Sequence, residues 1–117
     1  MDFWATWCRP CVGEIPHLKD VHDEFGDKGL EIVGISLDSV QRISRVRVER
    51  FVKQNSVTWD QVYKDAESIA DRFRVRAIPA MFLIDGDTGA ILASGDELRG
   101  SALQKTIAAK LRTKGPT

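Results

Sequence analysis

Residues 2–16 read DFWATWCRPCVGEIP, and this stretch holds both cysteines of the chain, Cys8 and Cys11. Trp7 precedes the first cysteine and Pro10 precedes the second. The apolar residues that open the stretch predict a short strand, and the residues from Pro10 onward predict a helix. The two thiols are therefore expected where the strand turns into the helix, one helical turn apart.

The composition of the chain is that of an ordinary soluble globular protein. Of its 117 residues, 43% are hydrophobic and 29% are charged, and we expect residues 1–117 to form a single domain. Seventeen Lys and Arg balance seventeen Asp and Glu, so no general attraction to nucleic acid or to an anionic membrane is expected. Two cysteines cannot build a disulfide framework, so the stability must come from a packed core.

Apolar residues recur every three or four positions after the cysteines and predict a helix from Pro10 to Phe25. Pro16 lies inside this helix, where it removes one backbone hydrogen bond and is expected to cause a kink. Gly26 and Gly29 then act as stop signals. The residues expected to face the core are Val12, Ile15, Leu18, Val21 and Phe25.

Buried strands and amphipathic helices alternate along the rest of the chain. The order predicts an α/β protein with a mixed sheet and helices on both faces. The first strand has only Asp2 to Ala5 to build it, whereas a strand usually has five or six residues. The other predicted strands are 30–38, 80–85 and 90–94, and the other predicted helices are 44–55, 66–73 and one that begins at Ser101 and ends before Gly115 and Pro116.

Side chains at the helix starts give finer predictions. Ser101 and Gln104 have the spacing of a capping box, and Asp65 stands where an N-cap is expected. Four arginines fall within 42–50, and we interpret them as a solvated face because Glu49 and Asp38 offset their charge. Trp59 and Tyr63 are interpreted as strand or core residues.

The Cys-x-x-Cys pair at a helix start favours thiol chemistry. Unpaired N–H groups and the positive helix end stabilise a thiolate at Cys8, and Arg9 adds a positive charge. A lowered pKa makes such a thiol reactive near neutral pH. Pro10 suits the first helical turn, where no N–H is needed. Cys11 is within reach to attack a mixed disulfide on Cys8.

The two cysteines have two other interpretations. A structural zinc site needs two more ligands, and the nearby candidates are His17 and His22. About twelve residues separate the ligand pairs of a zinc finger, so the spacing here is too short. Two buried cysteines as core filler are common, but that reading does not explain the flanking Trp7.

The same residues carry a resemblance to a known family. DFWATWCRPC, Pro16 and the run VRAIPAMFLID at 75–85 together resemble the thioredoxin superfamily. The run WCRPCVGEIP, followed by GLEIVGISLD at 29–38, is similar to the TlpA/ResA-like thiol–disulfide oxidoreductases of the redoxin (AhpC/TSA) grouping. The resemblance implies a thioredoxin-like three-layer α/β/α sandwich around a mixed central sheet.

The resemblance also implies roles for individual residues. Cys8 would be the exposed nucleophile and Cys11 the buried resolving cysteine. Pro79 matches the cis-proline that packs against the pair, and the backbone of Ile78 would bind a substrate segment in strand-like fashion. If the cysteines were absent, we would interpret Pro79 as part of a turn between a helix and a strand. The substrate would also meet Trp7, Arg9 and Pro10.

Two acidic residues have counterparts in related proteins. Glu14 matches an acid that tunes the cysteines of ResA-like proteins, although a solvated helix carboxylate is an equal alternative. Asp2 matches the buried carboxylate of thioredoxins, which accepts a proton as the resolving cysteine attacks. As the second residue, Asp2 is expected to be frayed and wet, so the sequence favours Glu14 slightly.

The chain departs from the family where it begins. The family's domain normally starts with further strands, including most of the central strand. We therefore expect a marginally stable monomer or a homodimer through the shortened first strand.

The sequence favours a thiol–disulfide oxidoreductase that exchanges electrons with protein thiols and disulfides and needs no metal or organic cofactor. A thiol peroxidase is the first alternative, but no Pro or Thr precedes Cys8 at the peroxidatic spacing. A non-catalytic module that binds partner segments along Ile78 and Pro79 is the second. The resemblance implies a bacterial protein that is exported or membrane-anchored, with the cytoplasm as the alternative.

Overall fold

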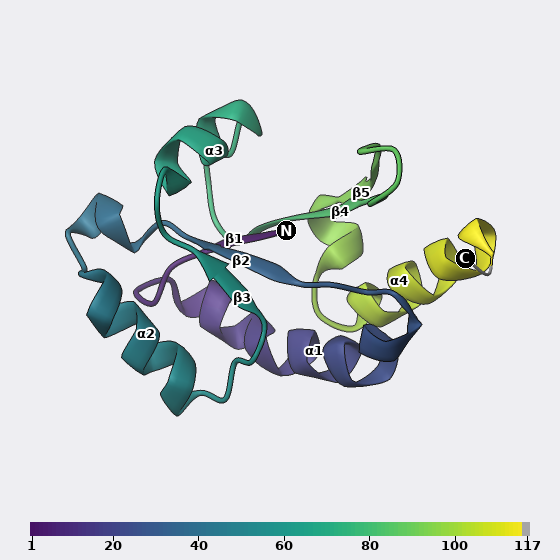
Figure 1. The fold of residues 1–117 in the computed structure, drawn as a ribbon, viewed down its shortest axis with the longest axis horizontal. Coiled ribbons are helices and arrows are strands. Elements are labelled where there is room, and N and C mark those ends of the chain that lie inside the picture. Colours follow the sequence, from purple (N-terminus) through teal and green to yellow (C-terminus); the bar gives the residue numbers. More distant parts are fainter. Residues whose placement is uncertain (116–117) are drawn as a thin grey trace.

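The structure, a computed structural model, describes residues 1–115 (Figure 1). The expected Pro116 stop signal and the end of the expected domain lie outside these residues. The strands are β1 (Asp2–Trp4), β2 (Val33–Ser36), β3 (Asp60–Val62), β4 (Ala80–Ile84) and β5 (Ile91–Ser94). The helices are α1 (Arg9–Phe25), α2 (Arg45–Gln54), α3 (Ala66–Arg72) and α4 (Ser101–Lys114).

The five strands form one mixed sheet in the order β3-β2-β1-β4-β5, which confirms the predicted sheet type. β1 runs parallel to β2 and antiparallel to β4. Asp2 and Phe3 are paired on both sides, with Gly34 and Ile35 on β2 and with Met81 and Ala80 on β4. Asp2 and Phe3 therefore offer a second molecule no free edge, and the predicted homodimer through the first strand stays a prediction.

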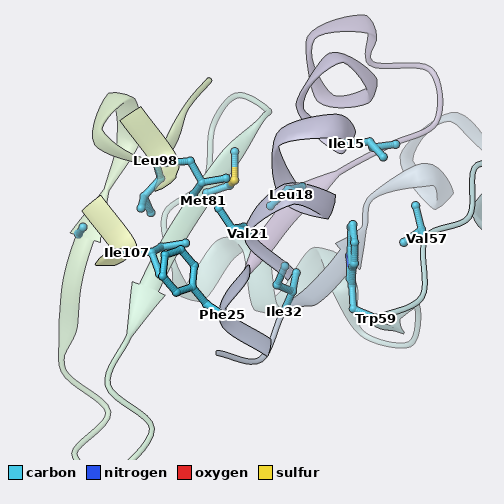
Figure 2. Close-up of a cluster of buried hydrophobic side chains, with 12 residues drawn as sticks. Ile15, Leu18, Val21, Phe25, Ile32, Val57, Trp59, Met81, Leu98 and Ile107 are labelled. Atoms are coloured by element: carbon cyan, nitrogen blue, oxygen red, sulfur yellow. The ribbon is translucent and has the colours of Figure 1, made fainter. Parts of the chain in front are cut away.

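Helices cover both faces of the sheet, as the sequence predicts. α1 and α4 pack on one face with α2 beside them, and α3 covers the other face (Figure 1). The inward stripe of α1 is confirmed, because Ile15, Leu18, Val21 and Phe25 are all buried. Figure 2 shows this stripe meeting Met81, Leu98 and Ile107 from the other half of the chain. The helix continues through Pro16, which lies on its exposed side.

The ends of several elements differ from the sequence predictions. The capping box is wrong, because Ser101 is already the first helical residue and Gly100, with φ 52°, takes the N-cap place without a side-chain hydrogen bond. Asp65 does precede α3, but its backbone is left-handed and its side chain caps nothing. β2 begins only at Val33, although the predicted strand began at residue 30.

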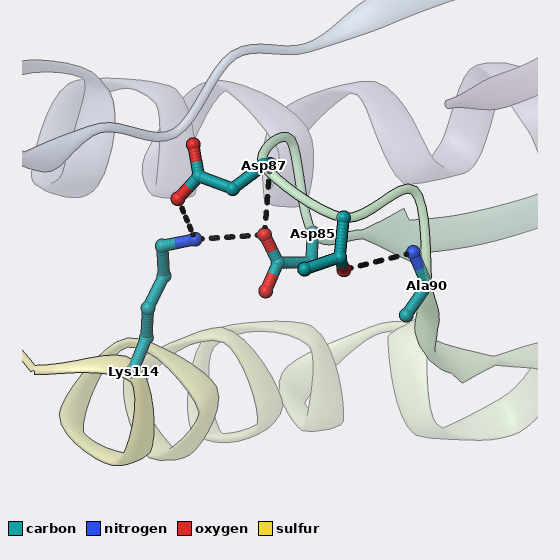
Figure 3. Close-up of polar contacts among 5 residues, drawn as sticks. Asp85, Asp87, Ala90 and Lys114 are labelled. Carbon is teal, nitrogen blue, oxygen red and sulfur yellow. Dashed lines mark hydrogen bonds and ion pairs between the residues drawn. The ribbon is translucent and has the colours of Figure 1, made fainter.

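The β4–β5 hairpin is tied to the end of α4 by charge. Lys114 Nζ lies 2.8 Å from a carboxylate oxygen of Asp85 and 2.8 Å from one of Asp87 (Figure 3). Asp85 also accepts a hydrogen bond from the backbone N–H of Asp87, which shapes the turn. Gly89 completes the turn with φ 78°, a conformation that favours glycine. The turn of the hairpin therefore lies beside the last turn of α4.

Candidate active site

The cysteine pair lies at the start of α1, as predicted. Cys8 is the N-cap residue, with extended backbone, and its Sγ accepts a hydrogen bond of 3.3 Å from the backbone N–H of Cys11. Pro10 occupies the first turn, where its missing N–H costs nothing. The two cysteines form a disulfide with 5.2 Å between their Cα atoms. The Cys8 sulfur therefore lies where the helix end supplies unpaired N–H groups.

Exposed residues surround a buried disulfide. Cys8 is 6% exposed and Cys11 is 2% exposed, whereas Trp7 is 44% exposed. Arg9 and Pro10 are exposed as well. The burial of both cysteines also fits the alternative that they only fill the core. The exposed residues Trp7, Arg9 and Pro10, however, give a second protein a surface from which to approach Cys8.

A buried carboxylate holds the turn that precedes Cys8. Asp38 is 1% exposed and accepts two hydrogen bonds from Thr6, one from its backbone N–H at 3.0 Å and one from its hydroxyl. The hydroxyl of Ser36 donates a third at 2.7 Å. The sequence indicated Asp38 only as a charge that offsets the arginines at 42–50, and it did not predict that this carboxylate is buried. Its position at the end of the predicted strand was the only sequence signal for this role.

The segment that carries Pro79 reaches the cysteine cluster through Ile78. The Ile78–Pro79 peptide bond is cis, Pro79 is buried, and Ile78 packs on the cluster that contains Cys8 and Cys11. The carbonyl oxygen of Pro79 accepts a hydrogen bond of 2.8 Å from Arg99 Nη2. Sequence analysis missed Arg99, because twenty residues separate it from Pro79 and no motif connects the two.

Glu14 is half-buried on α1 and has a defined partner. Its Oε2 accepts a hydrogen bond of 3.0 Å from the backbone N–H of Gly100, just after the segment that carries Arg99. The alternative of a freely solvated carboxylate is wrong for this residue. Glu14 and Arg99 thus fix two neighbouring segments, α1 and the loop before α4, around the cysteine pair and Pro79.

Asp2 is buried rather than frayed, which corrects the sequence prediction. It is 7% exposed because β2 and β4 hold it on both sides. Burial raises the pKa of Asp2 to about 7; the N-terminal ammonium opposes this rise and Glu14 adds to it. Within residues 1–115 its carboxyl accepts no side-chain or backbone hydrogen bond that would stabilise the charged form. A carboxyl with this pKa can take and release a proton near neutral pH.

A small cavity of about 10 Å³ lies beside Asp2, enclosed by β1, by Ile15 of α1 and by the segment 57–61 that leads into β3. Its polar walls are Asp2 and Gln61, and Gln61 Oε1 accepts a hydrogen bond of 2.8 Å from Trp4 Nε1. Ile15, one turn after Cys11, lines the same cavity. Asp2 therefore faces the helix that carries the cysteines, and the cavity has the size of a single water molecule.

The histidines take no part in this arrangement. His22 is half-buried and packs on Trp59, with 5.5 Å between the ring centroids. Trp59 is buried, which confirms its interpretation as a core residue, and Tyr63 packs beside the cysteine cluster. Among the described residues, no group of three or more His, Cys, Asp or Glu could hold a metal ion, and no helix is long and apolar enough to cross a membrane.

A mixed sheet with helices on both faces, a Cys-x-x-Cys pair at a helix start and a cis-proline beside it define a thioredoxin-fold protein. Residues 1–92 match the model of the AhpC/TSA family, and the chain belongs to that family. The family match, together with the relatives and solved structures described next, confirms the resemblance to the TlpA/ResA-like group of redoxins that the sequence indicated.

Curated relatives carry the name ResA. The chain is 31% identical over 84 residues to the thiol-disulfide oxidoreductase ResA of Oceanobacillus iheyensis, covering 72% of this chain and 42% of the relative. It is 28% identical over 116 residues to ResA of Bacillus thuringiensis subsp. konkukian, covering 99% and 62%. The chain thus spans about half the length of the curated relatives that it matches.

Solved structures show the same fold. The thioredoxin domain of a thiol-disulfide oxidoreductase from Bacteroides vulgatus has a TM-score of 0.82 and 30% identity, covering 94% of this chain and 76% of that one. A thio-disulfide isomerase from Thermus thermophilus has a TM-score of 0.75 and 27% identity, covering 99% and 78%.

Proposed function

We propose that this chain is a thiol–disulfide oxidoreductase that exchanges two electrons with protein thiols and disulfides through Cys8 and Cys11. The observation that carries the proposal is the disulfide at the N-terminus of α1, which lies in one cluster with Ile78 of the cis Ile78–Pro79 bond and is surrounded by exposed residues. The names of the relatives support it. Both cysteines and Pro79 belong to one molecule, so the chemistry needs no dimer.

In the reducing direction the pair begins as a dithiol. The Cys8 thiolate attacks one sulfur of a substrate disulfide, forms a mixed disulfide and releases one substrate thiolate. Cys11 then loses its proton and attacks Cys8 Sγ, which forms the Cys8–Cys11 disulfide and releases the second substrate thiolate. Two electrons pass from the protein to the substrate. A dithiol partner returns the protein to its reduced form.

Asp2 is the residue that we assign as the acceptor of the Cys11 proton. Its pKa of about 7 and its position on the strand beside α1 support this role. Glu14, which the sequence favoured, is instead bound to the Gly100 N–H, and we assign it to positioning. Trp7, Arg9 and the backbone of Ile78 would contact the substrate segment.

The test is insulin reduction by the chain with dithiothreitol as electron source. The wild-type chain should accelerate it, Cys8→Ser should abolish the acceleration, and Cys11→Ser should trap a covalent mixed disulfide that dithiothreitol releases. A thiol peroxidase is the second candidate, because the AhpC/TSA match is shared with that chemistry. Peroxide consumption that depends on Cys8, without insulin reduction, would favour the peroxidase.

Two further assignments belong to this proposal. We assign residues 1–117 to one thioredoxin-like domain. We also place the protein outside the cytoplasm, exported or anchored to the membrane, as the TlpA/ResA resemblance implies. Fractionation of the native host, followed by detection with an antibody to the chain, tests the location. The homodimer through the first strand is not part of the proposal, because both edges of β1 are paired within the chain.

A further inference from the structure

Exposed arginines adjoin the cluster of side chains that contains the two cysteines. One of them directly follows Cys8, and the other three come from the segment 42–47 at the start of α2. All of them are exposed. We call this set the arginine rim, and its members are Arg9, Arg42, Arg45 and Arg47.

Packing ties the start of α2 to the cysteines. Val48 is 1% exposed and belongs to the same buried cluster as the cysteine pair. Phe51 packs against this cluster as well, with 5.9 Å between its ring centroid and that of Trp4. Arg47 lies one turn before Phe51, so the two share a side of the helix and Arg47 borders the cluster. Figure 1 shows the start of α2 beside the turn that leads into α1.

Arg45 borders the cluster from the opposite side of α2, because two residues correspond to a rotation of about 200°. Its guanidinium carbon lies 4.6 Å from the centroid of the Tyr63 ring, and Tyr63 packs against the cysteine cluster. Its Nε lies 2.8 Å from Glu49 Oε1. A guanidinium stacked on an aromatic ring keeps its remaining N–H groups available at its edge.

Few carboxylates offset the charge of the arginine rim. Asp38, whose charge the sequence sets against the arginines at 42–50, is buried and holds the turn that precedes the cysteines. Glu49 pairs with Arg45, and Glu67 of α3 accepts a hydrogen bond of 3.2 Å from Ser39. The other three arginines of the rim make no ion pair with any described residue.

The far end of α1 carries the opposite charge. Residues 20–31 hold five acids and one lysine, Lys28. α1 has 17 residues and is therefore about 25 Å long, so most of this acidic stretch lies far from Cys8. The net charge of the chain is zero, and its positive and negative charges are thus separated along α1. Such a separation turns an acidic partner toward Cys8 as it approaches.

We propose that the arginine rim selects redox partner proteins whose reacting cysteine is flanked by acidic residues. This inference rests on the proposed function and adds a class of partner to it. Thiol–disulfide exchange brings the partner's sulfur to Cys8, so the residues beside that sulfur come close to Arg9 and to the start of α2. Carboxylates there would form charge-assisted hydrogen bonds with the guanidinium groups, whereas basic residues would be repelled.

The test compares three synthetic peptides that each contain one disulfide and differ only in the residues beside the cysteines, which are Glu, Gln or Lys. The reduced 117-residue chain is mixed with each peptide, and the second-order rate constant is measured at about 0.01 M and about 1 M salt. Each constant is divided by that of dithiothreitol, an uncharged dithiol, which corrects for the intrinsic reactivity of the peptide. At low salt the Glu peptide should react about tenfold faster than the Lys peptide, and at high salt the two should be nearly equal.

Reversing one charge of the rim should reduce this preference. Arg47→Glu should lower the low-salt ratio of the Glu to the Lys peptide by about threefold or more, and Arg42→Glu should do the same. Arg47→Glu places an acid three residues after the N-cap Ser44, where acids favour a helix, so the chain should stay folded. Lys28→Glu changes the net charge equally at the far end of α1 and should leave the ratio near its original value. Circular dichroism checks the fold of each variant.

Four results would overturn the inference. If the chain reduces the Gln peptide but shows no preference for Glu over Lys, the inference fails and the proposed function stands. If the chain reduces none of the peptides, both fail. If Arg47→Glu and Lys28→Glu lower the preference equally, net charge and not the rim is responsible. Binding of labelled single-stranded DNA at about 0.15 M salt that Arg47→Glu abolishes would assign the rim to nucleic acid instead.

Discussion

Thr6 donates both its backbone N–H and its hydroxyl to the carboxylate of Asp38, which lies 32 residues further along the chain and is 1% exposed. The contact joins the end of β2 to the turn that presents Cys8. Because Ser36 donates to the same carboxylate, three donors depend on one buried acceptor.

Asp38→Ala should therefore destabilise the protein and loosen the turn that precedes Cys8. Each buried donor left without a partner costs about 1–3 kcal/mol, so we expect a loss of roughly 3 kcal/mol in the free energy of unfolding by urea. Asp38→Asn keeps one acceptor oxygen and should cost less. Asp71→Asn, at an exposed site, is the control. A loss below 1 kcal/mol for Asp38→Ala would show that the network is not structural.

Asp2 should make stability fall as the pH rises. Its pKa is about 7 in the folded chain and 3.8 as a reference, so the folded state binds the proton more tightly. Protonated Asp2 contributes roughly 4 kcal/mol to the free energy of unfolding. This contribution is fully present below about pH 4 and is lost as the pH rises through about 7. Asp2→Asn should remove this slope and be more stable than the wild type at pH 8. Asp20→Asn is the control; equal pH profiles for wild type and Asp2→Asn would contradict the prediction.

Glu14 should be coupled to Asp2 through charge. Glu14 contributes to the raised pKa of Asp2, so Glu14→Gln should shift the titration midpoint of Asp2 downward. NMR of the carboxyl carbons measures this shift directly. Asp23→Asn, an exposed change on the same helix, should leave the midpoint in place. The coupling is refuted if both variants move it equally or neither moves it.

The fold was largely predictable because its elements are coded locally. The apolar stripe of α1 and the runs of β2 and β4 each carry their own periodicity, and the structure confirms them. β3 was missed because two of its three residues, Asp60 and Gln61, are polar and the strand lies at a sheet edge. The strand predicted from residue 30 begins only at Val33, because its ladder with β3 starts at the Val33–Asp60 pair and a strand needs a paired neighbour.

The site was predictable only where a motif carried it. Cys8, Cys11 and Pro79 stand in recognisable runs. Asp38 and Arg99 act through contacts across 32 and 20 residues, which periodicity does not reveal. The burial of Asp2 was mispredicted because a residue near a terminus is usually frayed, and only the sheet order shows that two strands enclose it.

Arg99 should affect substrate binding more than reaction at the cysteines. Its guanidinium donates to the Pro79 carbonyl oxygen, next to the Ile78 backbone that we assign to the substrate. Arg99→Ala should raise the KM for a protein disulfide several-fold and leave kcat within about twofold. Arg99→Lys should restore part of the loss, because lysine retains one donor. An unchanged KM, or an equal loss in kcat, would place Arg99 outside substrate positioning.

Cys8 in the reduced chain should be the more reactive thiol and should ionise below the free-thiol pKa of about 8.5. Its place at the N-cap of α1 exposes its sulfur to the Cys11 N–H and to the positive end of the helix, and both favour the thiolate. Cys11 is 2% exposed and has no such position. The rate of alkylation by iodoacetamide, measured against pH on Cys11→Ser, should give a midpoint clearly below about 8.5. The same measurement on Cys8→Ser should give slow alkylation and no midpoint below about 8.5. A midpoint near 8.5 for Cys8 would remove the basis for its role as nucleophile.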